Sequence, residues 1–250
     1  MSNILELSHV EKIYGEKENQ VKALKDINIQ VKEGEFIAIV GPSGCGKSSL
    51  LSILCGIEDK TGGSFIFPDT KKNKLGYMLQ NDSLFPWLTI LDNCLIGLKV
   101  SKKLTFENIS YVKKLLEMYG LRDFMYNYPS SLSGGMRQRV ALIRTLAIKP
   151  DILLLDEPFS ALDYQTRLAV SDDVYQIIKK EHKTAIMVTH DLAEAISIAD
   201  GVVVLTNRPA TVKKIFEIKL TNRKNPIENR KCVEFSKYYE DIWKELDFHV

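Results

Sequence analysis

Residues 41–48 constrain the fold of this chain more than any other stretch. They read Gly-Pro-Ser-Gly-Cys-Gly-Lys-Ser, which matches the G-x-x-x-x-G-K-[ST] pattern of a phosphate-binding loop. The loop follows a continuous apolar run at 36–40, which predicts a buried parallel strand, and it precedes a helical pattern at Ser48–Leu54. A glycine-rich turn can match such a pattern by chance, and the strand–loop–helix context is what favours phosphate binding.

Each residue type in this loop suits a triphosphate. Glycines let backbone N–H groups curl around phosphate oxygens, and the following helix points its partial positive end at them. Lys47 adds a positive charge, and the Ser48 hydroxyl can ligate Mg²⁺. We also expect the helix N-terminus to favour the thiolate of Cys45. The predicted nucleotide-binding residues here are Gly41, Pro42, Ser43, Gly44, Cys45, Gly46, Lys47, Ser48 and Ser49.

An acidic pair follows the apolar run at 152–155. Asp156 stands at the end of this predicted strand, where its carboxylate can hold Mg²⁺ through water. Glu157 is placed to orient or deprotonate an attacking water. Such a pair can also simply begin a loop, but the phosphate-binding loop elsewhere in the chain favours the catalytic interpretation.

A second helix terminus suited to an anion is predicted at residues 133–135. Ser133, Gly134 and Gly135 open a predicted helix that runs to about Lys149. The simpler interpretation is an N-cap followed by flexible glycines. Because the chain already has one helix terminus for phosphates, a second one requires an explanation.

The stretch Leu132–Arg139, Leu-Ser-Gly-Gly-Met-Arg-Gln-Arg, resembles the signature motif of ATP-binding-cassette (ABC) ATPases. Further family motifs occur in the expected order. Tyr14 resembles the aromatic residue that stacks on adenine, and Gln80 resembles the glutamine that senses magnesium and the membrane partner. Residues 160–163, Ser-Ala-Leu-Asp, resemble the D-loop, and His190 resembles the switch histidine that contacts the γ-phosphate.

The resemblance runs from about Leu5 to Arg208 and implies a role for each matching residue. It implies ATP and Mg²⁺ as cofactors, and a homodimer that forms on ATP binding. In that family two subunits meet head to tail, so the 133–135 segment of one chain serves the ATP held by the other. The implied catalytic residues are Glu157, His190, Lys47 and Gln80, the metal site comprises Ser48, Gln80 and Asp156, and Tyr14, Ser133, Gly134, Gly135 and Asp163 complete the nucleotide site.

Strands that alternate with helices predict a parallel, doubly wound sheet. The predicted fold class is α/β: a P-loop NTPase (RecA-like) parallel-sheet core with an N-terminal antiparallel β portion and an inserted α-helical subdomain. A strand pair is expected around 65–67 and 76–79. Within a single ABC ATPase domain spanning 1–250, we assign 1–84 and 150–210 to the α/β core, 85–149 to the helical subdomain with the signature motif, and 211–250 to a C-terminal extension.

Composition limits the kinds of molecule that this chain can be expected to bind. A net charge of +2 lacks the basic excess of a sequence-independent nucleic-acid binder, and the cluster at 71–74 predicts a solvated loop. Four scattered cysteines without a C-x-x-C pair argue against zinc or disulfides and suit a reducing cytosol. No apolar run approaches the roughly 20 residues that cross a bilayer. The resemblance therefore implies separate transmembrane permease subunits, an extracytoplasmic solute-binding protein acting indirectly, and a peripheral location on the cytoplasmic face of the cell membrane.

Two segments resemble one importer subfamily, which handles nitrate, sulfonates, taurine and thiamine-precursor pyrimidines. They are 84–93, Leu-Phe-Pro-Trp-Leu-Thr-Ile-Leu-Asp-Asn, and 207–210, Asn-Arg-Pro-Ala, where Ala210 replaces the usual glycine. Phe85 and Trp87 are expected either to dock the permease or to fill the core of the helical insertion. Export, or another cargo, stays open as the alternative, because an ATPase subunit does not touch the cargo.

Two departures from the family pattern and two rival classes complete the sequence picture. Ser49 stands where threonine is common and is expected to be silent, and the short 63–79 segment predicts a trimmed hairpin near adenine. An ABC-type ATPase acting on DNA generally needs long coiled coils, and no heptad pattern is sustained here. A P-loop kinase or GTPase would lack the Leu132–Arg139 motif.

Overall fold

The computed structural model describes residues 2–16, 19–69 and 74–246, so most of the basic cluster at 71–74 lies outside the described residues. In chain order the strands and helices are β1 (Asn3–Tyr14), β2 (Val21–Lys32), β3 (Phe36–Val40), α1 (Lys47–Leu54), β4 (Gly62–Ile66), β5 (Leu75–Met78), α2 (Ile90–Val100), α3 (Phe106–Met118), α4 (Gly134–Ala147), β6 (Ile152–Asp156), α5 (Tyr164–Lys180), β7 (Thr184–Val188), α6 (Leu192–Ile198), β8 (Gly201–Leu205), β9 (Val212–Glu217), α7 (Pro226–Asn229) and α8 (Val233–Glu245). Two 3₁₀ turns, at Arg122–Phe124 and Pro129–Ser131, connect α3 to α4.

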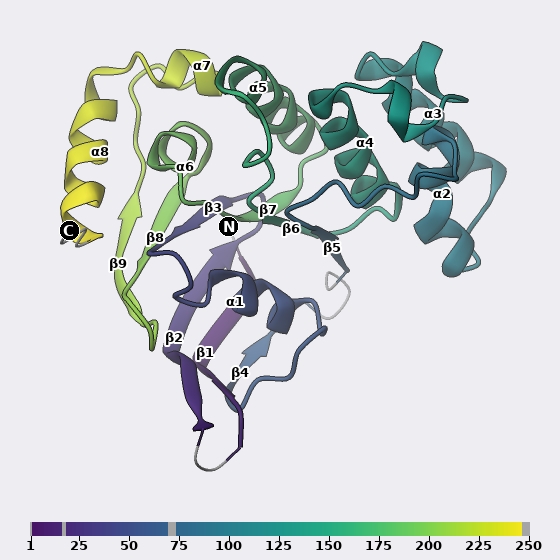
Figure 1. The fold of residues 1–250 in the computed structure, drawn as a ribbon. Helices are drawn as coiled ribbons and strands as arrows, with labels where there is room; N and C mark the ends of the chain where they lie inside the picture. Colours follow the sequence, from purple (N-terminus) through teal and green to yellow (C-terminus); the bar gives the residue numbers. More distant parts are fainter. Residues whose placement is uncertain (1, 17–18, 70–73, 247–250) are drawn as a thin grey trace.

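Two sheets organise the molecule (Figure 1). The larger has the order β5-β6-β7-β3-β8-β9 and is parallel except for β9, which pairs antiparallel with β8. The smaller is antiparallel, with the order β2-β1-β4. The four central strands of the larger sheet are the continuous apolar runs of the sequence, and every residue in them is buried. A strand covered on both faces has to be apolar throughout, which confirms the predicted fold class.

The two faces of the parallel sheet are covered by different elements. Ile37 and Ile39 of β3 pack in one cluster with α1 and the antiparallel sheet. Ala38 and Val40, the alternating residues, belong to the cluster that includes α2, α3, α4, α5 and α6. Figure 1 shows α1 on one side of the sheet and α4, α5 and α6 on the other.

The strand pair expected around 65–67 and 76–79 does not form. Strand β4 joins the antiparallel sheet, where Phe65 lies opposite Leu7, whereas β5 joins the parallel sheet, where Tyr77 lies opposite Leu154. Both faces of β5 are covered, and a Cβ on Gly76 would lie 2.7 Å from Thr145 Cγ2 of α4. This packing favours pairing of β5 with β6 at the edge of the parallel sheet over a hairpin with β4, so the prediction of a trimmed hairpin is also wrong.

Side-chain caps define the helices between 85 and 149. Thr89, Thr105 and Ser133 each accept a hydrogen bond from the backbone N–H three residues on, at the start of α2, α3 and α4.

The C-terminal tail, for which the sequence predicts only an extension, contains β9, α7 and α8, and α8 packs against the molecule through buried Ile242. Among the described helices, none combines the length and apolar character that spanning a membrane would require.

Candidate active site

The loop after β3 forms a cradle at the start of α1. Gly44 and Gly46 have φ values of 70° and 121°, a backbone region that favours glycine. A Cβ on Gly46 would also lie 2.9 Å from Leu24 Cδ2. Lys47 folds back over the loop, and its Nζ donates to the carbonyls of Gly41 at 2.8 Å and Pro42 at 3.0 Å.

No side chain among the described residues caps the N-terminus of α1. The first N–H groups of a helix need partners, and an uncapped terminus beside a buried ammonium group suits a phosphate. Within the cradle, Ser43, Gly44 and Ser48 are exposed, whereas Gly41, Cys45 and Lys47 are buried. The residues of the loop therefore fit the triphosphate of ATP.

Ser48 and Asp156 form the candidate magnesium site. Ser48 Oγ donates to Asp156 Oδ1 at 3.1 Å, which joins the first turn of α1 to the end of β6. Burial raises the pKa of Asp156, and the hydrogen bonds from Ser48 and Tyr77 oppose that shift. A hydroxyl and a carboxylate fit Mg²⁺, which completes its shell with waters and nucleotide phosphates. The described residues contain no cluster of three or more His, Cys, Asp or Glu side chains that could hold a metal by themselves.

Two predicted residues, Gln80 and His190, contact the same carboxylate oxygen of a third, Glu157. Gln80 Nε2 donates to Glu157 Oε2 at 3.0 Å, and His190 Nδ1 lies 3.3 Å from the same oxygen. The three residues follow β5, β6 and β7, which are neighbours in the sheet, so their carboxyl ends meet at one edge. Glu157 has φ 43°, an uncommon conformation for a residue with a side chain, and its N–H is held by the Val188 carbonyl at 2.9 Å.

Tyr14, the last residue of β1, is joined to α1 by a hydrogen bond. Its hydroxyl donates to Glu58 and lies 2.8 Å from Ser49 Oγ, and Lys12 Nζ lies 4.7 Å from the ring centre. Burial and the bond to Glu58 raise the pKa of Tyr14. The Ser49 hydroxyl therefore has a hydrogen-bond partner in Tyr14. The expectation that serine in place of threonine at this position has no effect did not include this contact.

The 133–135 segment lies on the opposite face of the sheet from the phosphate-binding loop (Figure 1). Ser133 caps α4, where its Oγ accepts from the Met136 N–H at 3.3 Å. Gly135 is buried, and a Cβ there would lie 3.0 Å from methyl groups of Thr166 and Val170 on α5. The two helix termini that are predicted to bind anions therefore lie apart within one chain.

Asp163 caps α5 in this structure. Its carboxylate accepts from the Thr166 N–H at 3.1 Å, and hydrogen bonding to Thr166 lowers its pKa. A contact between Asp163 and nucleotide, which the resemblance implies, stays a prediction.

The expectation that Cys45 favours the thiolate form is wrong. Only 1% of the Cys45 surface is exposed, and its side chain packs in the apolar cluster beneath the sheet. Burial raises the pKa of this thiol, and the attraction of Lys47 only partly opposes the rise. The loop presents its backbone to the phosphate site while this side chain turns into the core.

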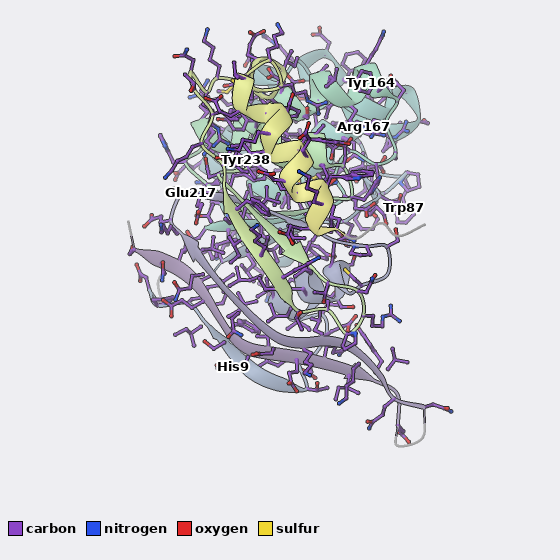
Figure 2. The ribbon with its side chains drawn as sticks, turned by 90° about the vertical axis from the view of Figure 1, so that its left-hand side faces the viewer. His9, Trp87, Tyr164, Arg167, Glu217 and Tyr238 are labelled. Atoms are coloured by element: carbon purple, nitrogen blue, oxygen red, sulfur yellow. The ribbon has the colours of Figure 1, made fainter. Side chains whose placement is uncertain are left out.

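Arg167 joins two loops of the site, a role that sequence analysis missed. Its Nη2 donates to the Leu162 carbonyl of the D-loop at 3.0 Å. Its Nη1 lies 3.4 Å from Asp191 Oδ2 and its Nε lies 3.7 Å from Glu194 Oε1, both beyond His190. In Figure 2 Arg167 lies among the helices of the upper part of the molecule. An arginine within a helix carries no sequence signal for such a bridge.

Two further arginines tie α4 to the segment after Gln80. Arg137 Nε lies 2.9 Å from Asp82 Oδ2, and Arg144 donates to the carbonyls of Asp82 and Ser83 at 2.7 Å each. Arg137 belongs to the Leu132–Arg139 motif, but nothing in the motif identifies its partner. The residues after Gln80 are thus attached directly to the helix that Ser133 caps.

Comparison with known proteins places this site in a family. A family model described as ABC transporter matches residues 24–160. The chain is 43% identical over 250 residues to the uncharacterized ABC transporter ATP-binding protein YtlC of Bacillus subtilis, a match that covers 98% of this chain and 96% of that protein. It is 38% identical to the nitrate import ATP-binding protein NrtD of Synechocystis sp., covering 95% of this chain and 93% of that protein.

A solved structure agrees. The dimeric ATP-binding cassette MJ0796, in a post-hydrolysis state bound to ADP and Pi, has a TM-score of 0.72 and 31% identity to this chain, covering 86% of it and 99% of MJ0796. Residues 24–160, which match the family model, include the phosphate-binding loop, the Leu132–Arg139 motif and the acidic pair. The chain belongs to the ABC transporter family, as an ATP-binding subunit whose hydrolysis of ATP is coupled to transport.

Proposed function

We propose that this chain works as a homodimer that powers import of a small solute, of the nitrate or sulfonate type, through a separate permease. The observation that carries this proposal is an exposed aromatic pair, Phe85 and Trp87, which follows Gln80 in the chain and of which Phe85 lines an apolar groove. Identity to a nitrate import ATP-binding protein over nearly the whole chain supports the direction and the class of cargo. A solute-binding protein would act only through the permease, and the chain would sit on the cytoplasmic face of the membrane.

The site supports hydrolysis by a positioned base. Lys47 and the α1 terminus would bind the phosphates, and Glu157 would orient the attacking water and accept its proton. Gln80 and His190 both contact the Glu157 carboxylate, so each can influence where that base points. Bound Mg²⁺, held by Ser48 and Asp156 with Gln80 as the third predicted ligand, would offset the phosphate charge.

The two separated helix termini support a homodimer. One chain holds its 133–135 segment on the far face of the sheet from its own phosphate-binding loop, which favours a role for this segment at a nucleotide held by another copy. A head-to-tail pair related by a two-fold axis would supply both nucleotides with both termini. MJ0796, which shares the fold, was solved as a dimer.

Phe85 and Trp87 form a docking surface for the permease. Trp87 is 70% exposed and Phe85 36% exposed, with ring centres 5.5 Å apart, and Figure 2 shows Trp87 at the margin of the molecule. The alternative, that both fill the core of the helical insertion, is wrong for Trp87. Large exposed aromatics are characteristic anchors of protein interfaces.

The surface is preformed and continues into a groove. Asn93 is fully buried; it accepts from the Phe85 N–H at 2.8 Å and donates to the carbonyls of Phe85, Leu88 and Thr89. The groove has a volume of about 540 Å³ and is lined mainly by apolar side chains, among them Phe85, Ile96, Leu98, Val100 and Ile148. A short amphipathic helix of the permease fits such a groove.

Arg137 and Arg144 supply the link from this surface to the nucleotide. Arg137 holds the Asp82 side chain and Arg144 holds the backbone carbonyls of Asp82 and Ser83, so the segment between Gln80 and Phe85 is fixed against α4. A permease segment that moves Phe85 would therefore act on α4 and on Ser133 at its N-terminus.

Uptake in a deletion strain tests the proposal. The strain receives wild type, Phe85→Ala/Trp87→Ala, or the control Phe106→Ala, which removes an 87% exposed aromatic on α3. Uptake of nitrate, an aliphatic sulfonate, taurine and a pyrimidine is measured, together with the ATPase rate of each purified chain. We expect the double variant to keep its ATPase rate within about twofold and to lose uptake about tenfold or more, since loss of anchor residues costs over 1 kcal/mol each.

The control should transport like wild type. Uptake by the double variant at the wild-type rate would remove the docking role. Normal uptake of every solute in the strain without the chain would refute the import proposal as a whole.

A further inference from the structure

Tyr77 places a hydroxyl on the carboxylate of the candidate magnesium site. It lies on β5, three residues before Gln80, and its OH donates to Asp156 Oδ2 at 3.2 Å. The other carboxylate oxygen, Oδ1, accepts from Ser48 Oγ at 3.1 Å. Each oxygen of Asp156 is therefore held by a separate hydroxyl group.

Sheet register explains how Tyr77 reaches this position. Tyr77 lies opposite Leu154 on β6, and side chains alternate along a strand, so Tyr77, Leu154 and Asp156 face the same side. Tyr77 and Leu154 pack in the cluster beside α1, whereas their neighbours Met78 and Leu155 pack on the opposite face. The long tyrosine side chain can thus extend along β6 from Leu154 to Asp156.

Packing also holds the Tyr77 ring in place. The ring is half-buried and packs against the apolar cluster beside α1, so its orientation is restricted by packing as well as by the hydrogen bond to Asp156.

We propose that Tyr77 is a positioning residue for Mg²⁺, an inference that rests on the magnesium role proposed above for Ser48 and Asp156. By holding Oδ2, Tyr77 keeps Oδ1 directed at Ser48, where the metal and its waters would lie. Partners that orient a metal-binding carboxylate typically change metal affinity by 10- to 100-fold when they are lost. A residue that only fills space would leave metal affinity unchanged when its hydroxyl alone is removed.

Tyr77→Phe tests this, because it removes the hydroxyl and keeps the ring. Tyr111→Phe is the matched control: the Tyr111 hydroxyl is also partly buried and donates to a carboxylate, Glu181, at 2.8 Å. Mn²⁺ is titrated into each full-length chain saturated with ADP, and free Mn²⁺ is followed by electron paramagnetic resonance. ATP binding in EDTA and the Mg²⁺ concentration for half-maximal ATPase are measured in parallel.

We expect Tyr77→Phe to bind Mn²⁺ about tenfold more weakly and to need correspondingly more Mg²⁺, with ATP binding in EDTA unchanged. Tyr111→Phe should match wild type in all three measurements. Equal Mn²⁺ affinity in Tyr77→Phe and wild type would overturn the inference, and so would an equal loss of ATP binding with and without metal. Failure of wild type to bind Mn²⁺ with nucleotide would instead refute the magnesium role itself.

Discussion

At the scale of single residues, the site depends on where a few polar groups point. Glu157 Oε2 is shared by Gln80 and His190, while its backbone adopts φ 43°. Strained backbone conformations of this kind cost about 1–3 kcal/mol and persist where the surrounding structure requires them. A base held by two neighbours on adjacent strands can be oriented without moving the sheet.

Glu157→Gln should keep ATP binding and lower the turnover rate by about 10²- to 10⁴-fold. The amide fills the same space and can keep a hydrogen bond to Gln80, but it cannot accept a proton from water. Phosphate release and nucleotide binding by the purified variant measure the two effects separately. Glu107→Gln, at an exposed position on α3, serves as the control. A wild-type rate in Glu157→Gln would show that another group acts as the base.

Cys45 should resist alkylation in the folded chain, with or without Mg-ATP. Its burial and raised pKa keep the thiolate scarce, and burial likewise raises the pKa of Cys94 to about 12. Maleimide labelling read by mass spectrometry should modify the partly buried Cys55 and Cys232 first, and all four cysteines in urea. Rapid labelling of Cys45 that Mg-ATP prevents would instead restore the expectation drawn from the helix N-terminus.

At the scale of elements, α6 connects the His190 loop to α5. Asp191 caps the helix by accepting from the Glu194 N–H at 3.0 Å, and Glu194 Oε2 accepts from Thr189 Oγ1 at 2.9 Å. Glu194 is almost completely buried, and Arg167 approaches it from α5. Burial first, and then Asp191, raise the pKa of Glu194 to about 7, whereas Thr189, Arg167 and Arg230 oppose the rise.

This shift predicts a pH dependence of stability. The pKa of Glu194 is raised from 4.5 to about 7 on folding, so the folded chain binds more protons than the unfolded chain between these values. The contribution of Glu194 is therefore greatest below pH 4.5 and falls as pH rises towards 7, by up to about 3 kcal/mol. Glu194→Gln should remove this term. Urea denaturation of both chains from pH 5 to pH 8 measures it, and the free energy of unfolding of the variant relative to wild type should increase with pH. A difference that stays constant across the range would show that Glu194 does not titrate as described.

At the scale of the whole molecule, the sheet separates the two helix termini of the proposed composite site. The α1 terminus lies on one face and the α4 terminus on the other (Figure 1). Assembly is therefore part of the proposed mechanism, and a charge at position 133 should act on a nucleotide in another copy. Gly135→Asp would be a poor probe, because Gly135 is packed against Thr166 and Val170.

Ser133→Asp in the Glu157→Gln background should prevent an ATP-dependent dimer, and Ser133→Asn should permit it. Both side chains can cap α4, so the pair differs in charge alone. A carboxylate close to the γ-phosphate of the facing nucleotide is unfavourable in a confined site. Light scattering after size exclusion, with and without ATP, gives the oligomeric state. A dimer that forms equally well in both variants would contradict the composite site.

Local patterns made the core of this protein predictable. The glycines and Lys47 of the loop, the apolar run before Asp156 and the alternation of strands and helices each reflect a requirement of short-range geometry. Residues adjacent in the sequence, such as Asp156 and Glu157, remain adjacent in the fold. The resemblance also identified Gln80, Glu157 and His190, but it did not predict their direct contact. That contact follows from the sheet, because neighbouring parallel strands bring their ends together.

The amino-acid sequence by itself determined the phosphate-binding loop, the buried strand segments and the Ser133 cap, since these depend on patterns within a few residues. Only the tertiary structure decided that β4 and β5 belong to different sheets and that Cys45 turns into the core. It also decided that Tyr77 and Arg167 reach carboxylates far along the chain. The physical reason is that register, packing volume and burial are set by segments distant in sequence, and no local pattern of residues specifies which of them will meet.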